Sequence, residues 1–152
     1  PIHLPQGAAC SSERSRLSAL AMFTSPHDVN QLQTLEAATR VCQAMLTGEE
    51  FRAVFDLFER FPDEDGYGIF WSLVHAVEAA GGYEAALLES VGRKPVEFNV
   101  MMIGRLLNAG VLECSGQNLE VLLKLVAARE GISAEARLTA QNLLSNGRRR
   151  EA

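Results

Sequence analysis

The sequence predicts an all-α fold, a HEAT-like α–α bundle of stacked helical hairpins. Apolar residues recur every three or four positions through most of residues 25–146, which is the period of an amphipathic helix. No segment shows the sustained alternation of apolar and polar residues that indicates a strand, and turns rich in Gly or Pro separate the periodic segments. Short helices joined by short turns favour stacked hairpins, so we expect roughly 65–75% helix and at most two short strands.

Length and composition set the domain prediction. The chain has 152 residues, a length that suits one domain with its own core. Hydrophobic residues make up 47% and charged residues 22%, values that are typical of globular proteins and argue against disorder. We predict a loose N-terminal arm over residues 1–12, a single all-α domain over residues 13–147 and a basic tail over residues 148–152.

The first two helices are predicted from start signals and from the spacing of apolar residues. A short helix is expected at residues 13–23. Ser25 is the expected N-cap of the second helix, because Pro26 suits the first helical position and the acidic Asp28 complements the helix dipole. This helix is expected to end near Gly48. Its apolar face consists of Val29, Leu32, Leu35, Ala38, Cys42 and Met45.

The third helix has the clearest start and stop. Thr47 and Glu50 have the spacing of a capping box, in which each side chain accepts a bond from a free backbone amide of the other residue. Pro62 stops the helix, because proline has no amide hydrogen to continue the backbone ladder. The acidic turn that follows separates it from the next helix.

Glycines and prolines bound the remaining helices. We expect them at residues 70–80, 83–93, 95–109, 119–130 and 133–146, with Ser133 as the cap of the last and the pair Asn146 and Gly147 as its end. Residues 111–116 form a connection with some strand character. The apolar faces predict a core that includes Phe51, Phe55, Phe58, Leu73, Val77, Leu106, Leu122 and Val126.

Charge and cysteine content indicate the kind of partner and compartment. The formal net charge is −5, so the surface as a whole repels a phosphate backbone and attracts a basic protein. Three widely spaced cysteines do not form a disulfide framework, which favours a reducing cytoplasm. No apolar run has the length of about 20 residues that a membrane span needs, and the first ten residues do not read as a secretory signal.

No catalytic, cofactor or metal motif is present in the sequence. It contains no GxSxG, no Walker loop, no GxGxxG and no HExxH, so we predict neither an enzyme nor a cofactor or metal site. His75 and Glu78 lie three residues apart on one helix and could do acid–base chemistry or hold a metal, but two such residues are too few. We therefore favour a structural, hydrogen-bonded role for both.

A second polar pair lies on a mostly apolar helix. Arg105 and Asn108 are also three residues apart, and neighbouring helices could bring Arg105 to Glu78. The favoured interpretation is a buried or half-buried salt bridge that fixes the register of the helices. The alternative is a ligand site made from the guanidinium and the carboxylate.

Acidic residues are concentrated between Glu49 and Asp65. Seven acids lie in this segment and only Arg52 and Arg60 oppose them, so its local charge equals that of the whole chain. The plain interpretation is a solvated helix face followed by a polar loop. The functional interpretation is a docking patch for a basic protein, to which the nearby Tyr67, Tyr83 and Trp71 could add aromatic anchors. Trp71 is expected to belong to the core. The predicted partner-binding residues are Glu59, Asp63, Glu64, Asp65 and Tyr67.

Three short motifs stand out between residues 61 and 144: the helix FWSLVHAVE at residues 70–78 after an acidic loop, the segment PVEF at residues 95–98 and the segment RLLN at residues 105–108. With these motifs, residues 61–144 resemble immunity protein family 30 of bacterial polymorphic-toxin systems. The resemblance implies a cytoplasmic protein that binds and neutralises a cognate toxin without a catalytic step. It makes Trp71, His75, Glu78, Arg105 and Asn108 motif positions, for which we favour a structural role.

Two other functions remain open on the sequence alone. A HEAT-like adaptor or scaffold would bind a different protein partner and would have no toxin gene beside its own. An enzyme based on His75 and Glu78 would need both side chains in one pocket with a further acid, base or metal ligand.

Overall fold

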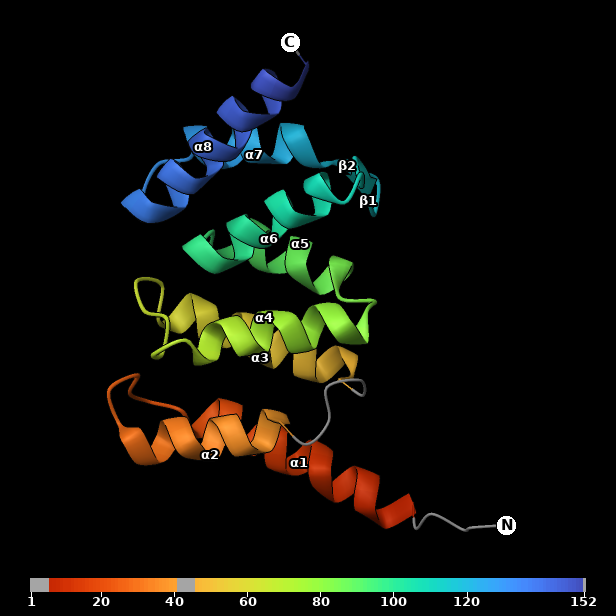
Figure 1. The fold of residues 1–152 in the computed structure, drawn as a ribbon, viewed down its shortest axis with the longest axis vertical. Coiled ribbons are helices and arrows are strands. Elements are labelled where there is room, and N and C mark those ends of the chain that lie inside the picture. The colour runs from red at the N-terminus through yellow and green to blue at the C-terminus, as the bar shows by residue number, and fades with distance from the viewer. Residues whose placement is uncertain (1–5, 41–45, 152) are drawn as a thin grey trace. The chain divides into compact units, whose positions relative to one another are not determined.

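The computed structural model describes residues 6–40 and 46–151 and is 71% helical, which confirms the all-α prediction (Figure 1). Eight helices and one two-stranded sheet are found in this part of the chain. The chain divides into two compact units, Pro1–Leu57 with Glu64–Tyr83, and Phe58–Asp63 with Glu84–Ala152. Each unit is described by itself, and the single domain over residues 13–147 stays a prediction.

The first unit contains α1 (Gln6–Met22), α2 (Val29–Arg40), most of α3 (Gly48–Arg60) and α4 (Ile69–Ala80). Helix α1 packs against α2, and α2 packs against α4. The rings of Phe23 and Phe70 meet edge to face in this core, with centroids 6.2 Å apart. Large apolar side chains that are fully buried there include Leu20, Leu35, Phe55 and Leu73.

Helix α1 corrects the predicted N-terminal arm. It starts at Gln6, so the part of residues 1–12 that the structure describes is helical rather than loose. Residues 1–5 lie outside the described part of the chain. The arm is predicted from the poor patterning of residues 1–12 and from Pro1, Pro5 and Gly7, but a glycine near the start of a helix weakens it without preventing it.

Helix α2 starts one turn later than Ser25 predicts. Asp28 is its N-cap: the side-chain Oδ1 accepts hydrogen bonds from the amides of Asn30 and Gln31, at 2.9 and 3.1 Å. The Gln31 side chain in turn accepts from the amides of Thr24 and Ser25, at 2.8 and 3.1 Å. These bonds hold Thr24 and Ser25 in the preceding turn. The helix is described to Arg40, and the predicted end near Gly48 follows residues 41–45, which lie outside the described part.

The second unit contains α5 (Glu84–Arg93), α6 (Glu97–Asn108) and the hairpin α7 (Leu119–Ala128) and α8 (Ala134–Glu151). Helix α5 packs on α6, and α6 contacts both α7 and α8. The strands β1 (Glu113–Cys114) and β2 (Gln117–Asn118) form an antiparallel hairpin before α7. This hairpin confirms the strand character expected near residues 111–116.

Helix α8 corrects the expected stop at Asn146 and Gly147, because it continues to Glu151. Its start is as predicted, since the Ser133 hydroxyl accepts a hydrogen bond from the amide of Ala136 at 3.1 Å. The predicted basic tail therefore begins inside a helix. Packing of α8 against α6 and α7 stabilises the helix and outweighs a local stop signal that costs about 1 kcal/mol.

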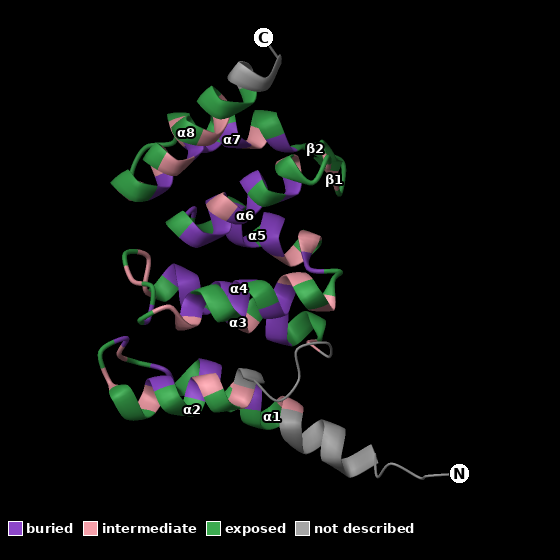
Figure 2. Ribbon diagram, viewed as in Figure 1, coloured by how far each residue is buried: buried purple, intermediate pink, exposed green. Residues whose placement is uncertain are grey.

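The predicted core is confirmed at seven of its eight positions. Figure 2 shows buried residues along α3 and α4 and along α5 and α6. Leu122 is the exception, since it is only partly buried while Leu119 and Leu123 are almost fully buried. The buried stripe of α7 therefore consists of Leu119, Leu123 and Val126, with Leu122 at its edge. Across the described residues, no helix is long and apolar enough to cross a membrane.

Candidate functional site

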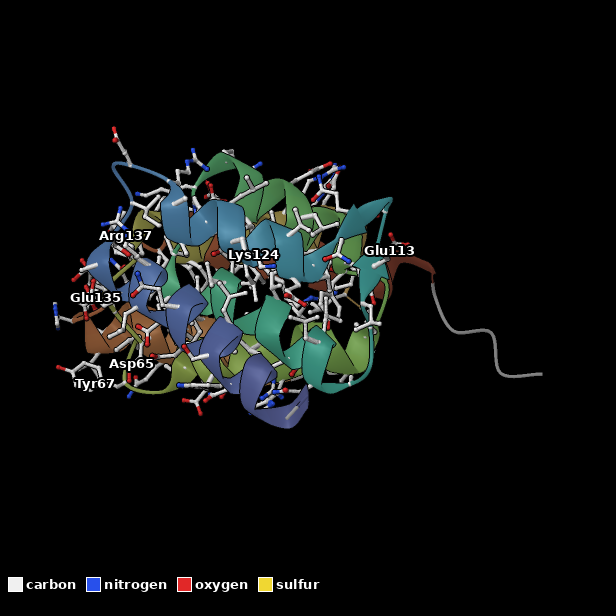
Figure 3. The ribbon with its side chains drawn as sticks, turned by 90° about the horizontal axis from the view of Figure 1, so that it is seen from above. Asp65, Tyr67, Glu113, Lys124, Glu135 and Arg137 are labelled. Carbon is white, nitrogen blue, oxygen red and sulfur yellow. The ribbon has the colours of Figure 1, made fainter. Side chains whose placement is uncertain are left out.

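Four polar and aromatic side chains come together in the first unit, at the loop that precedes α4. We call Glu64, Asp65 and Tyr67 of this loop, with His27 of the turn between α1 and α2, the acid–aromatic cluster. His27 Nε2 lies 3.2 Å from Glu64 Oε1, and the rings of His27 and Tyr67 meet edge to face with centroids 6.2 Å apart. Figure 3 shows Asp65 and Tyr67 beside each other at the edge of the molecule. The first three residues were predicted from the sequence, whereas His27 was not.

Asp65 fixes the backbone of this loop. Its side-chain Oδ1 accepts a hydrogen bond from the amide of Tyr67 at 3.0 Å. Its carbonyl oxygen accepts bonds from the amides of Gly68 and Phe70, both at 3.1 Å. The acid therefore has a structural task in addition to its charge, because a side-chain acceptor of this kind stabilises a tight turn.

Gly66 and Gly68 allow the loop to take a left-handed path. Gly66, Tyr67 and Gly68 have φ angles of 58°, 53° and 88° in succession. A Cβ at Gly66 would also lie 2.9 Å from ring carbons of Phe70, whereas a Cβ at Gly68 would meet no atom within 4 Å. Gly66 is therefore needed both for its backbone angle and for the close approach of Phe70, which anchors the loop to the core.

Tyr67 is held in an unfavourable backbone conformation at an exposed position. A left-handed φ costs a non-glycine residue about 1–2 kcal/mol, and yet 75% of Tyr67 is exposed to solvent. The side chain therefore recovers little energy from burial in the free protein. Strain of this kind is often kept where a side chain is needed for binding, so Tyr67 is the strongest single candidate for a contact residue.

His27 contacts the cluster, but its interaction with Glu64 contributes little to the stability of the loop. The side chains of His27 and Glu64 are 64% and 38% exposed, so their interaction is screened by water and by salt. The contact joins residues 37 positions apart. No local pattern signals such a contact, which explains why the sequence did not identify His27 as part of the cluster.

Glu59 was predicted to contact a partner, and the structure corrects this. Its carboxylate is almost fully buried in the second unit. It accepts two hydrogen bonds from Arg93, at 2.8 and 2.7 Å, and one from the Ser90 hydroxyl at 3.1 Å. Ser90 is itself bonded to the buried amide of Asn99 at 2.9 Å. Glu59 is therefore part of an internal polar network and is not accessible to a partner.

Glu50 is a second internal acid in the acidic segment. It is fully buried in the first unit and pairs with Arg16 of α1, whose Nη2 lies 2.9 Å from Glu50 Oε1 and whose Nε donates to Oε2. The segment is thus less charged at its surface than the sequence count suggests. The acids that remain exposed or partly exposed are Glu49, Asp56, Asp63, Glu64 and Asp65.

The motif positions of α4 lie on its exposed side. Trp71 was expected in the core, but it is 38% exposed, because Phe70 takes the buried position beside it. Trp71 lies next to His75, with ring centroids 6.3 Å apart, and His75 Nδ1 lies 3.9 Å from Glu78 Oε1. At this distance the two side chains form no hydrogen bond, and they are 64% and 23% exposed, so the hydrogen-bonded role expected for His75 and Glu78 stays a prediction.

Arg105 and Asn108 of the second unit are exposed on α6. Glu78 belongs to the first unit, so the predicted pairing of Glu78 with Arg105 joins residues of different units and stays a prediction. Cys114 in β1 is a free and partly exposed cysteine. Within the described residues, no group of three or more His, Cys, Asp or Glu side chains is placed to hold a metal.

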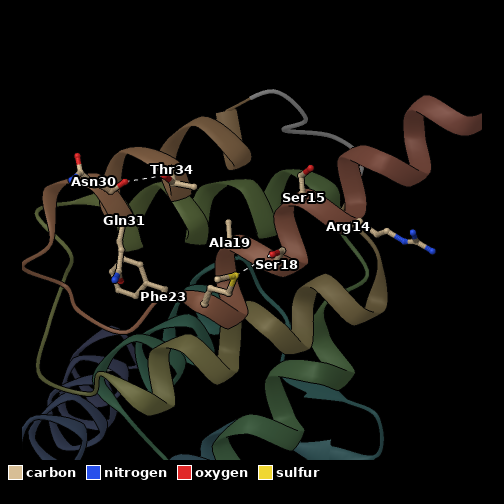
Figure 4. A pocket seen from close by; sticks show the side chains of 9 residues that line it. Arg14, Ser15, Ser18, Ala19, Phe23, Asn30, Gln31 and Thr34 are labelled. Atoms are coloured by element: carbon tan, nitrogen blue, oxygen red, sulfur yellow. Dashed lines mark hydrogen bonds between the residues drawn. The ribbon is translucent and has the colours of Figure 1, made fainter.

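A groove of about 630 Å³ lies between α1 and α2 in the first unit (Figure 4). Ala19 and Phe23 give it apolar walls, and Ser18, Gln31 and Thr34 add polar groups. The Ser18 hydroxyl lies 3.5 Å from the Met22 sulfur, and Thr34 bonds to the carbonyl of Asn30 at 2.9 Å. Hydroxyl, amide and apolar groups of this kind suit contacts rather than proton transfer, so we assign the groove no chemistry.

Comparison with protein-family models, curated proteins and solved structures finds no match for this chain.

Proposed function

We propose that this chain binds another protein and that the partner is a basic bacterial toxin domain, which the chain neutralises by covering it. The proposal rests on the resemblance of residues 61–144 to an immunity protein family and on the acid–aromatic cluster. The observation that carries it is Tyr67, which is strained, 75% exposed and fixed in place by Asp65.

The chemistry of the cluster suits a protein surface with positive charge. Tyrosine offers a large apolar ring and a hydroxyl with few rotatable bonds, and it is enriched among residues that dominate binding energy. Glu64 and Asp65 beside it, with Asp63 next along the chain, would attract Lys and Arg side chains of a partner. Because hydrogen bonds already order the loop, little conformational entropy is lost on binding.

The test uses the protein product of the gene beside this one, with and without this chain. Co-expression should protect cells from that product, and the purified proteins should form a complex. The Tyr67→Asn variant should weaken the complex by tenfold or more, since the small polar side chain of asparagine cannot replace a ring that is buried at an interface. The matched control is Trp71→Asn, which removes another exposed aromatic outside the cluster.

Charge is tested separately with amide variants. Asp63→Asn, Glu64→Gln and Asp65→Asn together remove three charges but keep the Oδ1 acceptor that Tyr67 needs. The triple variant should associate more slowly at low salt and lose most of its salt dependence, because screening acts over about 8 Å at physiological ionic strength. If the triple variant associated as fast as the wild type at both salt concentrations, the acidic loop would not belong to the docking surface. A neighbour that is harmless to cells but still binds would favour the adaptor function instead.

A further inference from the structure

A hollow of about 250 Å³ lies within the second unit, where α6 contacts both helices of the α7–α8 hairpin. All three helices contribute leucines to its walls: Leu107 from α6, Leu123 from α7, and Leu143 and Leu144 from α8. Leu123 is almost fully buried, and the other three are partly buried. The hollow is therefore set into the packed helices, and its lining is mainly apolar.

Two glycines explain why this space is open. Gly104 on α6 allows α8 to approach closely, because a Cβ there would overlap the side chain of Leu143. Four residues farther along the two helices, and therefore on the same faces, lie Asn108 on α6 and Gly147 on α8. A Cβ at Gly147 would meet no atom of the described residues within 4 Å. One turn beyond the close contact, α8 thus has no side chain to fill the space beside α6.

The local structure does not require a glycine at position 147. Gly147 lies inside α8, where glycine weakens a helix relative to alanine. It has no left-handed φ, and unlike Gly104 it makes no close contact that a Cβ would prevent. The effect of Gly147 on the structure is to leave room between the leucines, and a concave apolar space with a few polar groups at its edge is typical of a ligand site.

The lining favours an uncharged ligand. Of the lining residues that the structure describes, only Glu120 is charged, and its carboxylate lies 3.1 Å from the Lys124 ammonium. A charged group placed between the leucines would lose its hydration without gaining a counter-charge. The exposed amides of Asn108 and Asn146 also line the hollow, and an amide can both donate and accept a hydrogen bond.

We propose that this hollow binds a small uncharged molecule that has an apolar body the size of two fused rings and one N–H or O–H group. An apolar cavity of about 150 Å³ holds a benzene ring, so the larger hollow has room for a second ring. The polar group of the ligand would reach the amide of Asn108 or Asn146 at the edge. The proposal does not depend on a toxin partner, because the acid–aromatic cluster belongs to the first unit.

The experiment follows the leucine methyl signals of the full chain by NMR while indole is added as the probe. The signals of Leu107, Leu123, Leu143 and Leu144 should shift together and saturate, with a Kd of about 1 mM or lower for a ligand of this size. Indole-3-acetate presents the same ring with a charge and should bind about tenfold more weakly or worse. Shifts that do not saturate, or that occur only at other methyl groups, would overturn the proposal. Equal binding of the two probes would overturn its assignment to an uncharged ligand.

A pair of glycine variants locates the site. Gly147→Leu places a side chain in the hollow and should weaken indole binding about tenfold or more. Gly92→Leu is the matched control, because Gly92 also lies near the end of a helix, and a Cβ there would also meet no described atom within 4 Å, but it does not line the hollow. Both changes replace a helix glycine with a good helix former, so circular dichroism should show that both variants fold. Equal indole affinities of the two variants would place the binding elsewhere and overturn the proposal.

Discussion

The carboxylate of Glu59 receives two hydrogen bonds from the guanidinium of Arg93, at 2.8 and 2.7 Å, across 34 residues of sequence. The two-pronged geometry is the strongest that an arginine and a carboxylate can adopt. It joins the last turn of α3 to the end of α5, and the Lys94 ammonium adds a bond to the carbonyl of Glu59 at 2.9 Å. Glu59, which the sequence analysis assigned to a docking surface, thus links two helices inside the second unit.

Glu59→Ala should therefore lower the free energy of unfolding by about 3 kcal/mol, because it leaves Arg93 and Ser90 without their acceptor. Asp63→Ala, at an exposed acid four residues on, should change it by less than about 0.5 kcal/mol. Urea unfolding followed by circular dichroism measures both. If the Glu59→Ala variant were as stable as the wild type but bound a partner poorly, Glu59 would be a residue of the docking surface after all.

The buried pair Arg16 and Glu50 should behave as a unit. Arg16→Met or Glu50→Leu alone should cost about 3–5 kcal/mol, because each removes one member of a buried ion pair and leaves the other charged group in the core. The double variant should recover most of this loss, since two apolar side chains can replace a buried ion pair. A double-mutant cycle of thermal unfolding tests the coupling, with the exposed Arg14→Met as control. Additive effects would show that the two side chains do not act together.

Gly66 and Gly68 make a matched pair of positions. Both have a positive φ, but only Gly66 would bring a Cβ against the Phe70 ring. Gly68→Ala should cost about 1–2 kcal/mol for the backbone angle alone. Gly66→Ala should cost about 1–3 kcal/mol more, because overpacking adds to the strain. Chemical denaturation of both variants measures the difference, and equal losses would mean that the ring of Phe70 moves aside freely.

Tyr67→Asn should stabilise the free protein. Asparagine tolerates the left-handed region that tyrosine avoids, so the gain should be about 0.5–1 kcal/mol after the loss of the contact with His27. Tyr67→Phe keeps both the strained angle and the ring and should leave stability unchanged. Differential scanning calorimetry compares the two. If Tyr67→Asn were destabilising, the position would be structural rather than kept for binding.

Local signals in the sequence were sufficient where one residue type decides the conformation. Gly81, Gly110 and Gly131 follow the ends of predicted helices and have φ angles of 73°, 89° and 78°. Such positions exclude most other residues, so the sequence predicts them well. The order of the helices and most of the core followed from these stops and from the apolar spacing between them.

Signals failed where two local choices have similar energies. Ser25 and Asp28 are both good N-caps, and the side chain of Gln31, by binding the amides of Thr24 and Ser25, selects Asp28. At the end of α8, glycine weakens a helix without forbidding it, and contacts with α6 and α7 decide the outcome. Neither the N-cap of α2 nor the end of α8 can therefore be predicted from the residues at the helix boundary alone.

The candidate site was only partly predictable because its partners are distant in sequence. Counting acids between Glu49 and Asp65 identified the loop with Tyr67, but it could not show which acids are neutralised. Glu50 meets Arg16 and Glu59 meets Arg93, and each pair is separated by 34 residues. Charge counts in a window treat such residues as exposed, so they overstate the negative charge of the surface.

The close packing of Gly104 on α6 against Leu143 on α8 has a consequence for how this chain can vary between species. A Cβ at position 104 would overlap both terminal methyl groups of Leu143, so a larger residue there requires the leucine side chain to move or to be replaced by a smaller one. The two positions should therefore change together. In diverged homologues, an alanine or serine at position 104 should be accompanied by a smaller residue at position 143, and drift at either site alone should be suppressed.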